Sequence, residues 1–417
     1  MVVADLEIHS RFARACSKTL NPQELNDWAK RKGVNLLSTG DITHPLWRRE
    51  FRNAVDERET GFFVLKSEKN DFLAPRFILG GEVSLMFREG EKKGRRVHLL
   101  FLAPSFEAVE RLVAKINHKG KLASDGRVIL SMSCREFALA CQEADPHIIV
   151  IPAHIWTPWF GLLGSKSGFD SIEEAFGDQA SYIRTYETGL SADPAMCWRV
   201  ETLNSRVLIS SSDAHSAPNM MREATLFNGN ITDYSYARLY DVLIEVGNKD
   251  YYGTLEFYPQ EGKYHADGHA ACKLTFDPAM TKTLKGRCPK CGGLITVGVN
   301  HRVDDLASHP VGYVPKHAGK VLYSVPLQEI IAEAVAKGKS TKSVQSLYFQ
   351  MISEIASEYS LLHEVESFPE WVPEKVVEGI YMVRRGEVNV IPGYDGVYGV
   401  VKLFSSGDSK VTRWGYS

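Results

Sequence analysis

The sequence predicts an α/β protein in which strands and helices alternate around a barrel, followed by a small zinc-binding module and a mainly helical C-terminal region. Three observations predict this organisation. Strand-like and helical segments alternate up to about residue 260. Histidine and carboxylate side chains recur where strand-like segments end, and a cluster of cysteines comes after them. We therefore expect a catalytic barrel over residues 1–262, a zinc-binding module over 263–310 and a helical region over 311–417.

The individual elements follow from local sequence signals. Asn21 followed by Pro22 has the pattern of a helix N-cap with a first-turn proline. Residues 106–117 repeat apolar side chains with a helical period, whereas residues 146–152 form an apolar run of the length of a buried strand. The other expected elements are strands over 34–38 and 206–210, helices over 326–333 and 341–357, and turns over 391–399 that lead into a final strand.

Length and composition are compatible with this organisation. The chain has 417 residues and 44% hydrophobic residues, enough for a barrel of about 250 residues and further modules. The formal net charge of −2 does not indicate a nucleic-acid-binding protein, although a local basic patch matters more than the total. We expect a cytoplasmic protein, because the N-terminus has no signal-peptide pattern and no segment has the apolar length of a membrane span.

A set of histidine and carboxylate residues in the first half of the chain predicts a barrel-borne metal centre. Nitrogen and oxygen donors of this kind suit zinc, manganese or iron. Two pairs, Glu7 with His9 and Asp213 with His215, are spaced by two, so on an extended strand both members face the same side. The candidate ligands are Glu7, His9, Asp41, His44, Glu82, His98, His154, Asp213 and His215. Metal-assisted hydrolysis is therefore the first reaction class to consider.

The cysteines indicate a second, structural metal site. The seven cysteines are an odd number and only the last three cluster, which does not fit a disulfide framework. Cys288 and Cys291 lie in a Cys-Pro-x-Cys-Gly-Gly sequence, the pattern of a zinc knuckle. Cys272 is a third ligand, and either His265 or His269 supplies the fourth. The spacing favours His269, because its two-residue gap to Cys272 repeats that of the second knuckle.

A long aromatic segment over residues 155–168 directly follows the candidate ligand His154. Large loops after barrel strands usually build substrate sites, but the aromatic side chains here could equally form a satellite core. Bases stack on aromatic faces, so these side chains are candidates for DNA contact. The candidate DNA-binding residues are Trp156, Trp159, Phe160 and Lys166 in this segment and Trp198 outside it.

The order of the ligand motifs resembles the polymerase and histidinol phosphatase (PHP) superfamily. This resemblance implies a distorted barrel of the (β/α)7 type around two or three metal ions. The chain departs from the family pattern at two points. Glu7-Ile8-His9 replaces the usual His-x-His. The family has an aspartate directly before the histidine of the second motif, whereas here Thr43 directly precedes His44. His44 matches the second motif directly, and Asp41 is the nearest carboxylate.

Further motifs resemble the endonuclease Q family over nearly the whole chain. They are the segments 5–11, 39–47, 187–194, 211–216, 288–292, 301–303 and 392–396. Members of that family nick DNA on the 5′ side of deaminated bases such as hypoxanthine, uracil or xanthine, and at abasic sites. The resemblance implies a PHP catalytic domain, a zinc module and a helical C-terminal region that binds lesion-containing DNA. It also implies that the damaged base is flipped out of the duplex.

The resemblance assigns roles within the metal centre. Two or three divalent metals, zinc or alternatively manganese or magnesium, would activate a water molecule and neutralise charge on the scissile phosphate. Glu82 would bridge two ions, and Asp193 would be a ligand or a base, its alternative being a loop cap beside Pro194. Two other functions stay open: a small-molecule phosphoesterase of the histidinol phosphatase type, and a catalytically inactive nucleic-acid-binding protein.

Overall fold

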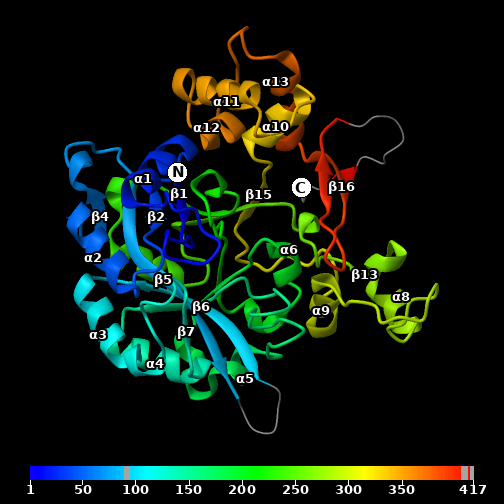
Figure 1. The fold of residues 1–417 in the computed structure, drawn as a ribbon, viewed down its shortest axis with the longest axis horizontal. Helices are drawn as coiled ribbons and strands as arrows, with labels where there is room; N and C mark the ends of the chain where they lie inside the picture. The colour runs from blue at the N-terminus through cyan, green and yellow to red at the C-terminus, as the bar shows by residue number, and fades with distance from the viewer. Residues whose placement is uncertain (89–93, 405–411, 414–417) are drawn as a thin grey trace.

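The computed structural model describes residues 1–88, 94–404 and 412–413. Figure 1 shows a large α/β body that carries the helices α10–α13 at one end and a smaller module with α8, α9 and β13 at one side. The helices are α1 Pro22–Lys32, α2 Pro45–Ala54, α3 Phe106–Ile116, α4 Cys134–Ala144, α5 Ile172–Phe176, α6 Pro194–Cys197, α7 Tyr236–Ile244, α8 Pro278–Thr283, α9 Val299–Leu306, α10 Leu327–Ala334, α11 Lys342–Glu354, α12 Glu358–His363 and α13 Glu374–Arg384.

Most strands of the α/β body belong to one branched, eleven-stranded sheet in the order β15-β12-β11-β1-β2-β5-β4-β3, with β6 and β7 pairing with β5 and β8 pairing with β6. Its strands are β1 Val2–Asp5, β2 Leu36–Ser38, β3 Val55–Glu59, β4 Phe62–Leu65, β5 Arg76–Phe87, β6 Arg95–Ala103, β7 Val128–Leu130, β8 Ile149–Pro152, β11 Ala224–Phe227, β12 Tyr251–Glu256 and β15 Lys320–Tyr323. The smaller sheets contain β9 Thr185–Glu187 with β10 Val207–Ile209, β13 Asp267–His269 with β14 Leu274–Phe276, and β16 Glu387–Ile391 with β17 Val400–Lys402 and β18 Thr412–Arg413.

The predicted α/β fold is confirmed, but the strand ladders of the described residues do not form a closed ring. The parallel pair β9–β10 is a sheet of its own that packs beside β8. On the other side, the backbone N–H of Ser210, just after β10, donates to the Thr225 hydroxyl of β11 at 3.1 Å. A side-chain hydrogen bond therefore connects β10 to β11 where a ladder would close a regular barrel.

Alternation along the strands separates two apolar cores. In β6, Leu100 and Leu102 pack in an inner core with Val2 and Ala4 of β1, whereas Leu99 and Phe101 join the outer core beneath the helices. Because side chains of a strand alternate between its two faces, His98 shares the inner face with Leu100. The sheet therefore directs particular polar side chains to the interior, and their position follows from strand parity.

The local signals for helices and turns agree with the structure. The Asn21 side chain accepts the Glu24 N–H at 3.0 Å and caps α1, which begins at Pro22 as expected. The helices expected near 106–117, 326–333 and 341–357 correspond to α3, α10 and α11, and the strand after the 391–399 turns is β17. Among the described residues no helix is both long and apolar enough to cross a membrane.

The region expected to be mainly helical also contributes to the large sheet. Strand β15 pairs in parallel with β12, from Gly253 opposite Lys320 to Glu256 opposite Tyr323. Helix α1 contacts α12 through an ion pair in which Lys32 Nζ lies 2.7 Å from Glu358 Oε2, with both side chains buried. The helices at the C-terminal end are thus fixed to the α/β body by a strand and by a buried ion pair.

Replacing Lys32 with Met should destabilise the protein by about 3–5 kcal/mol, because the Glu358 carboxylate would stay buried without its cation. The measurement is the free energy of unfolding in urea. Lys30→Met on the same helix is the matched control, because Lys30 is 39% exposed in its pair with Glu68 and should cost less than about 1 kcal/mol. Equal effects of the two substitutions would contradict this role for Lys32.

Candidate metal centre

The first candidate metal site lies where β1 continues beside the segment after β10. An isolated parallel bridge joins Ile8 to Ala214, and the His9 N–H donates to the Ala214 carbonyl at 3.1 Å. This pairing places His9 beside Asp213 and His215, and ligand atoms of these three residues lie within 4.8 Å of one another. His9 Nε2 is 3.0 Å from Asp213 Oδ1. One member of the first spaced pair, His9, therefore meets both members of the second pair, Asp213 and His215.

A second group combines residues from β5, β6 and the turn after β8. Glu82, His98 and His154 place ligand atoms within 4.8 Å of one another. Residue 82 pairs with Leu100 and residue 84 with His98, so Glu82 and His98 are diagonal neighbours on the inner face. Glu82 Oε1 lies 2.5 Å from His98 Nδ1 and 3.2 Å from His154 Nε2.

Glu82 connects the two groups. Its second oxygen, Oε2, lies 3.4 Å from His9 Nε2 in the first group and 3.0 Å from the Arg127 guanidinium. A carboxylate with one oxygen toward each group has the position that a bridging ligand requires. Burial lowers the pKa of His98 to about 4, so its imidazole is neutral, as metal ligation requires.

Backbone geometry at the ligand turns is strained. Asp41, His154 and Asp213 have φ values of +47°, +29° and +46°, in a region of backbone conformation that residues other than glycine rarely adopt. Strain of this kind clusters at functional sites, where the surrounding structure fixes it. Gly189 packs against the His154 turn, and a Cβ there would lie 2.3 Å from the His154 Cβ, so only glycine fits.

Buried oxygens without partners show that the residues present fit a bound cation. Neither Glu7 oxygen has a hydrogen-bond partner among the described residues, and Glu187 Oε1 and His154 Nδ1 also lack one. Burial, followed by the charge of Glu187, raises the pKa of Glu7, and burial raises that of Glu187 to about 7. Uncompensated buried carboxylates are costly unless a cation neutralises them. The Glu7 position thus supplies a donor that suits a metal ion.

Several residues of the site were not predicted from the sequence. Arg127 lies opposite Glu82 because β7 pairs with β5 with Val128 beside Val83, and no local motif announces this register. Glu187 accepts the His154 N–H at 2.8 Å, and only its occurrence in a family-like motif could have marked it. Asp5 accepts the N–H groups of Ser212 and Met221, which fixes the segment that carries Asp213.

Asp41 and His44, also predicted as ligands, lie outside the two groups of ligand atoms. Asp41 Oδ1 lies 3.1 Å from His9 Nδ1 and its Oδ2 accepts the Ser10 N–H. The His44 Nδ1 accepts the Trp47 N–H as the N-cap of α2, and its ring stacks on Phe12. Asp41 therefore orients the His9 ring so that Nε2 faces the other ligands, and His44 stabilises a helix end.

Asp193, predicted as a ligand or base with a cap as the alternative, lies at the start of α6. Its Oδ1 caps α6 by accepting the Met196 N–H at 2.9 Å, and its Oδ2 accepts the Tyr323 hydroxyl at 2.7 Å. Both oxygens are thus used in structural hydrogen bonds, which matches the cap alternative. The described ligand groups contain no atom of Asp193.

The predicted DNA-contact residues divide into buried and exposed ones. Trp156 has no exposed surface, and its indole N–H donates to the Cys197 thiol, so it is a core residue and cannot stack on a base. Trp198 is 8% exposed and lines a cavity between α6 and β15. Trp159 is 39% exposed, Lys166 is exposed, and the Phe160 ring lies 4.4 Å from that of His98.

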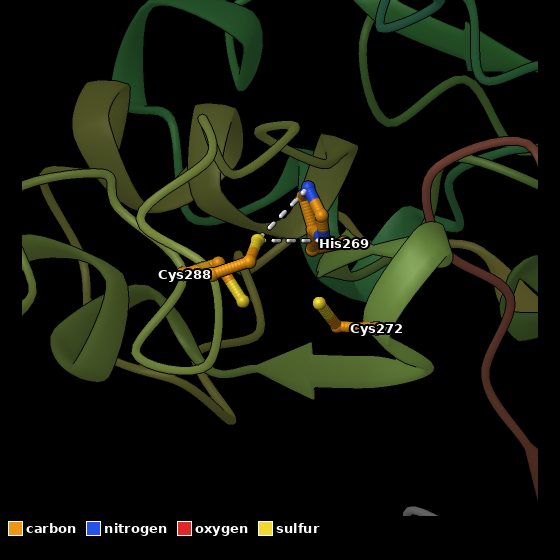
Figure 2. A group of neighbouring side chains, drawn as sticks. His269, Cys272 and Cys288 are labelled. Carbon is orange, nitrogen blue, oxygen red and sulfur yellow. Dashed lines mark hydrogen bonds between the residues drawn. The ribbon is translucent and has the colours of Figure 1, made fainter.

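The cysteine cluster forms a third group of ligands. His269 ends β13 and Cys272 follows one turn later, while Cys288 and Cys291 lie on the facing knuckle. The four ligand atoms lie within 4.8 Å of one another, and Figure 2 shows His269, Cys272 and Cys288 turned toward a common centre. A Cβ on Gly293 would lie 2.8 Å from His269 Nε2, so this glycine makes room for the histidine. This is a zinc-like Cys3His site.

His265, the other candidate fourth ligand, is not part of this group. It is buried beside the start of the module, where its backbone N–H donates to the Gly262 carbonyl. The module is instead held by Asp395, which accepts the Ala270 N–H at 2.6 Å and the Thr296 hydroxyl at 2.5 Å. The Pro-Gly-Tyr-Asp-Gly motif thus fastens the zinc-like site to the end of β16.

The fold and these ligand groups define an α/β protein with a candidate multinuclear metal centre and a separate Cys3His site. Its structure closely matches that of endonuclease Q. The lesion-specific endonuclease PfuEndoQ from Pyrococcus furiosus superposes with a TM-score of 0.83 and 29% identity, covering 96% of this chain and 95% of that one. Endonuclease Q in complex with a 27-mer duplex substrate bearing an abasic lesion gives a TM-score of 0.80 and 29% identity, with 96% of each chain covered.

One of two sequence relatives matches the chain over nearly its whole length, and the other matches part of it. Uncharacterized protein YqxK of Bacillus subtilis is 26% identical over 96% of this chain and 99% of its own length. Uncharacterized protein MJ0043 of Methanocaldococcus jannaschii is 31% identical over 253 residues, and the match spans 60% of this chain but about a third of that protein. The model of the MJ0043 C-terminal domain family matches residues 326–387.

Replacing Asp41 with Asn should lower the affinity of the centre for divalent metal about 10- to 100-fold, because the His9 ring loses the carboxylate that orients it. The measurement is a competition titration of Zn²⁺ or Mn²⁺ against a chromogenic chelator. Asp145→Asn, at the C-terminal end of α4, is the control and should leave the affinity unchanged. A variant D41N with unaltered affinity would show that His9 is held without Asp41.

Replacing Cys288 with Ser should remove one equivalent of bound zinc, because structural zinc sites depend on all four ligands. Metal content is measured by mass spectrometry on the purified protein. Cys141→Ala changes a buried thiol of α4 outside the cluster and should keep the full zinc content. Equal zinc content in C288S and the unmodified protein would exclude the Cys3His assignment.

Proposed function

We propose that this protein is a DNA repair endonuclease that nicks the phosphodiester on the 5′ side of deaminated bases and at abasic sites. The observation that supports this function most is the structural match to endonuclease Q over 96% of this chain, an extent that a catalytic body alone would not reach. A small-molecule phosphoesterase would need the catalytic body alone. We further propose that the catalytic body is a distorted PHP barrel over 1–262, with a zinc module over 263–310 and a DNA-binding region over 311–417.

We propose that two or three divalent metals bind to Glu7, His9, Glu82, His98, His154, Asp213 and His215, with zinc at the Cys3His site. Bound there, such metals would supply an activated water and neutralise the charge of the scissile phosphate. The side chains of Asp213 and His215 are 29% and 31% exposed, whereas Glu82 and His9 are buried. The phosphate would therefore approach from the side of Asp213 and His215.

Residues of the chain itself would position the substrate. The Arg127 guanidinium is held by Glu82 and its side chain is 27% exposed, so it can reach an anionic oxygen while it stays paired. The His215 Nδ1–H donates to the Asp213 carbonyl at 2.9 Å, which leaves Nε2 available as a ligand. The Arg127 guanidinium and the oriented His215 imidazole would favour binding of a charged phosphodiester over a neutral ester.

The test uses a 5′-labelled duplex with one deoxyinosine, deoxyuridine or abasic site, incubated with Mn²⁺ or Mg²⁺ and, in parallel, with a chelator. We expect a single, chelator-sensitive nick on the 5′ side of the lesion and none in the undamaged duplex. Hydrolysis of a phosphomonoester with no nick would assign the protein to the small-molecule branch. DNA binding without either reaction would favour an inactive binding protein.

Replacing Asp213 with Ala should reduce nicking at least about 100-fold, because the first ligand group loses its carboxylate at the exposed side. Single-turnover rates on the lesion duplex measure the effect, and circular dichroism checks the fold. Glu143→Ala is the control, since this exposed side chain of α4 forms a surface ion pair with Lys115. Full nicking activity of D213A would show that the active site is not at this metal centre.

A further inference from the structure

Beside the candidate metal centre, aromatic side chains from three distant segments gather around one lysine at the surface. Trp159 comes from the loop after β8, Tyr264 from the segment before β13, and Tyr398 from the turn before β17. The Trp159 and Tyr264 rings pack edge to face with centroids 5.6 Å apart. Lys263 Nζ lies 5.5 Å from the Tyr264 ring centre and 5.7 Å from that of Tyr398. These four residues are called the aromatic strip below.

Backbone hydrogen bonds hold two of the segments together. The Gly396 N–H donates to the Lys263 carbonyl at 2.9 Å, and the Ala266 N–H donates to the Gly393 carbonyl at 3.0 Å. Figure 1 shows β16 and β13 on the same side of the molecule, where these turns meet. The backbone of these two segments is therefore held together without any ligand.

The third segment is fixed to the α/β body and to the metal centre. The Arg302 guanidinium of α9 donates to the Leu163 carbonyl at 2.9 Å and so holds the loop after β8. The neighbour of Trp159, Phe160, accepts the His98 N–H at 2.8 Å, and its ring lies 4.4 Å from the His98 ring. Trp159 of the strip is therefore adjacent in sequence to Phe160, whose ring contacts the candidate metal ligand His98.

Exposure and charge indicate a ligand rather than a core. Tyr398 is 69% exposed and Trp159 is 39% exposed, although large aromatic side chains usually bury most of their surface. Lys263 is exposed and forms no salt bridge within the described part of the chain. Exposed aromatic faces next to an unpaired cation are the combination that binds single-stranded nucleic acid, by stacking on bases and attraction to phosphates.

We propose that the aromatic strip binds unpaired bases of the DNA strand that continues from the phosphodiester at the metal centre. This inference rests on the proposed function and deepens it, because it requires the two strands to separate on one side of the nick. The bases stack on Trp159 and Tyr398, and Lys263 contacts a phosphate between them. Within a duplex the base faces are already stacked on one another, so duplex DNA gains far less from the rings than a single strand does.

The test is binding of a fluorescein-labelled oligo(dT) of about 16 nucleotides, compared with a blunt duplex of the same length, by fluorescence anisotropy. Trp159→Ala and Tyr398→Ala should each weaken oligo(dT) binding about 5- to 150-fold, the range that corresponds to one lost stacking contact. Binding of the blunt duplex should change less than about 2-fold. Tyr398→Phe keeps the ring and should bind oligo(dT) like the unmodified protein.

Phe72→Ala is the matched control, because Phe72 is 70% exposed and follows β4 in the chain. Figure 1 shows β4 on the opposite side of the molecule from β16. Unchanged oligo(dT) binding by both alanine variants would overturn the inference. An equal loss on the blunt duplex, or an equal loss in F72A, would overturn it as well. The lesion-nicking assay on the unmodified protein separates the two proposals. If the protein nicks the lesion duplex and both alanine variants bind oligo(dT) normally, the proposed function is supported and only the role of the aromatic strip is rejected.

Discussion

The buried Glu82 carboxylate is the interaction on which the arrangement of the metal centre depends. It lies on the inner face of β5 and contacts histidines from β6, from the turn after β8 and from the segment after β1. A carboxylate without exposed surface is costly unless cations or hydrogen-bond donors surround it. The Arg127 guanidinium and three imidazoles meet this requirement. The contacts that stabilise the Glu82 carboxylate therefore hold residues from separate strands close together.

The same requirement extends outward through supporting residues. Asp41 orients His9, Glu187 holds the backbone of His154, and Asp5 holds the segment of Asp213. None of these carboxylates belongs to a ligand group, yet each fixes the position of one ligand. Ligands that are oriented in this way lose little freedom on binding a cation, which favours metal affinity. The strained backbone at Asp41, His154 and Asp213 is sustained by this network.

Two sets of polar contacts attach the C-terminal half to neighbouring elements. Asp395 ties the Cys3His module to β16, and the Lys32–Glu358 pair ties α12 to α1. Because β15 also enters the large sheet, the C-terminal helices are continuous with the catalytic body. A substrate that spans the metal centre and the module would therefore meet surfaces held in a fixed relation, which suits a long polymer such as DNA.

Features that depend on short spacings could be predicted from the amino-acid sequence alone. The alternation of Glu7 with His9, the zinc-knuckle pattern at Cys288 and the cap at Asn21 are local, so periodicity and turn chemistry define them. Three other contacts became visible in the folded chain: Arg127 lies opposite Glu82, the Asp193 carboxylate accepts hydrogen bonds from the Met196 N–H and the Tyr323 hydroxyl, and Trp159 packs against Tyr264. Except for the hydrogen bond with Met196, these contacts join residues far apart in the chain through strand register and loop packing, which no short pattern encodes.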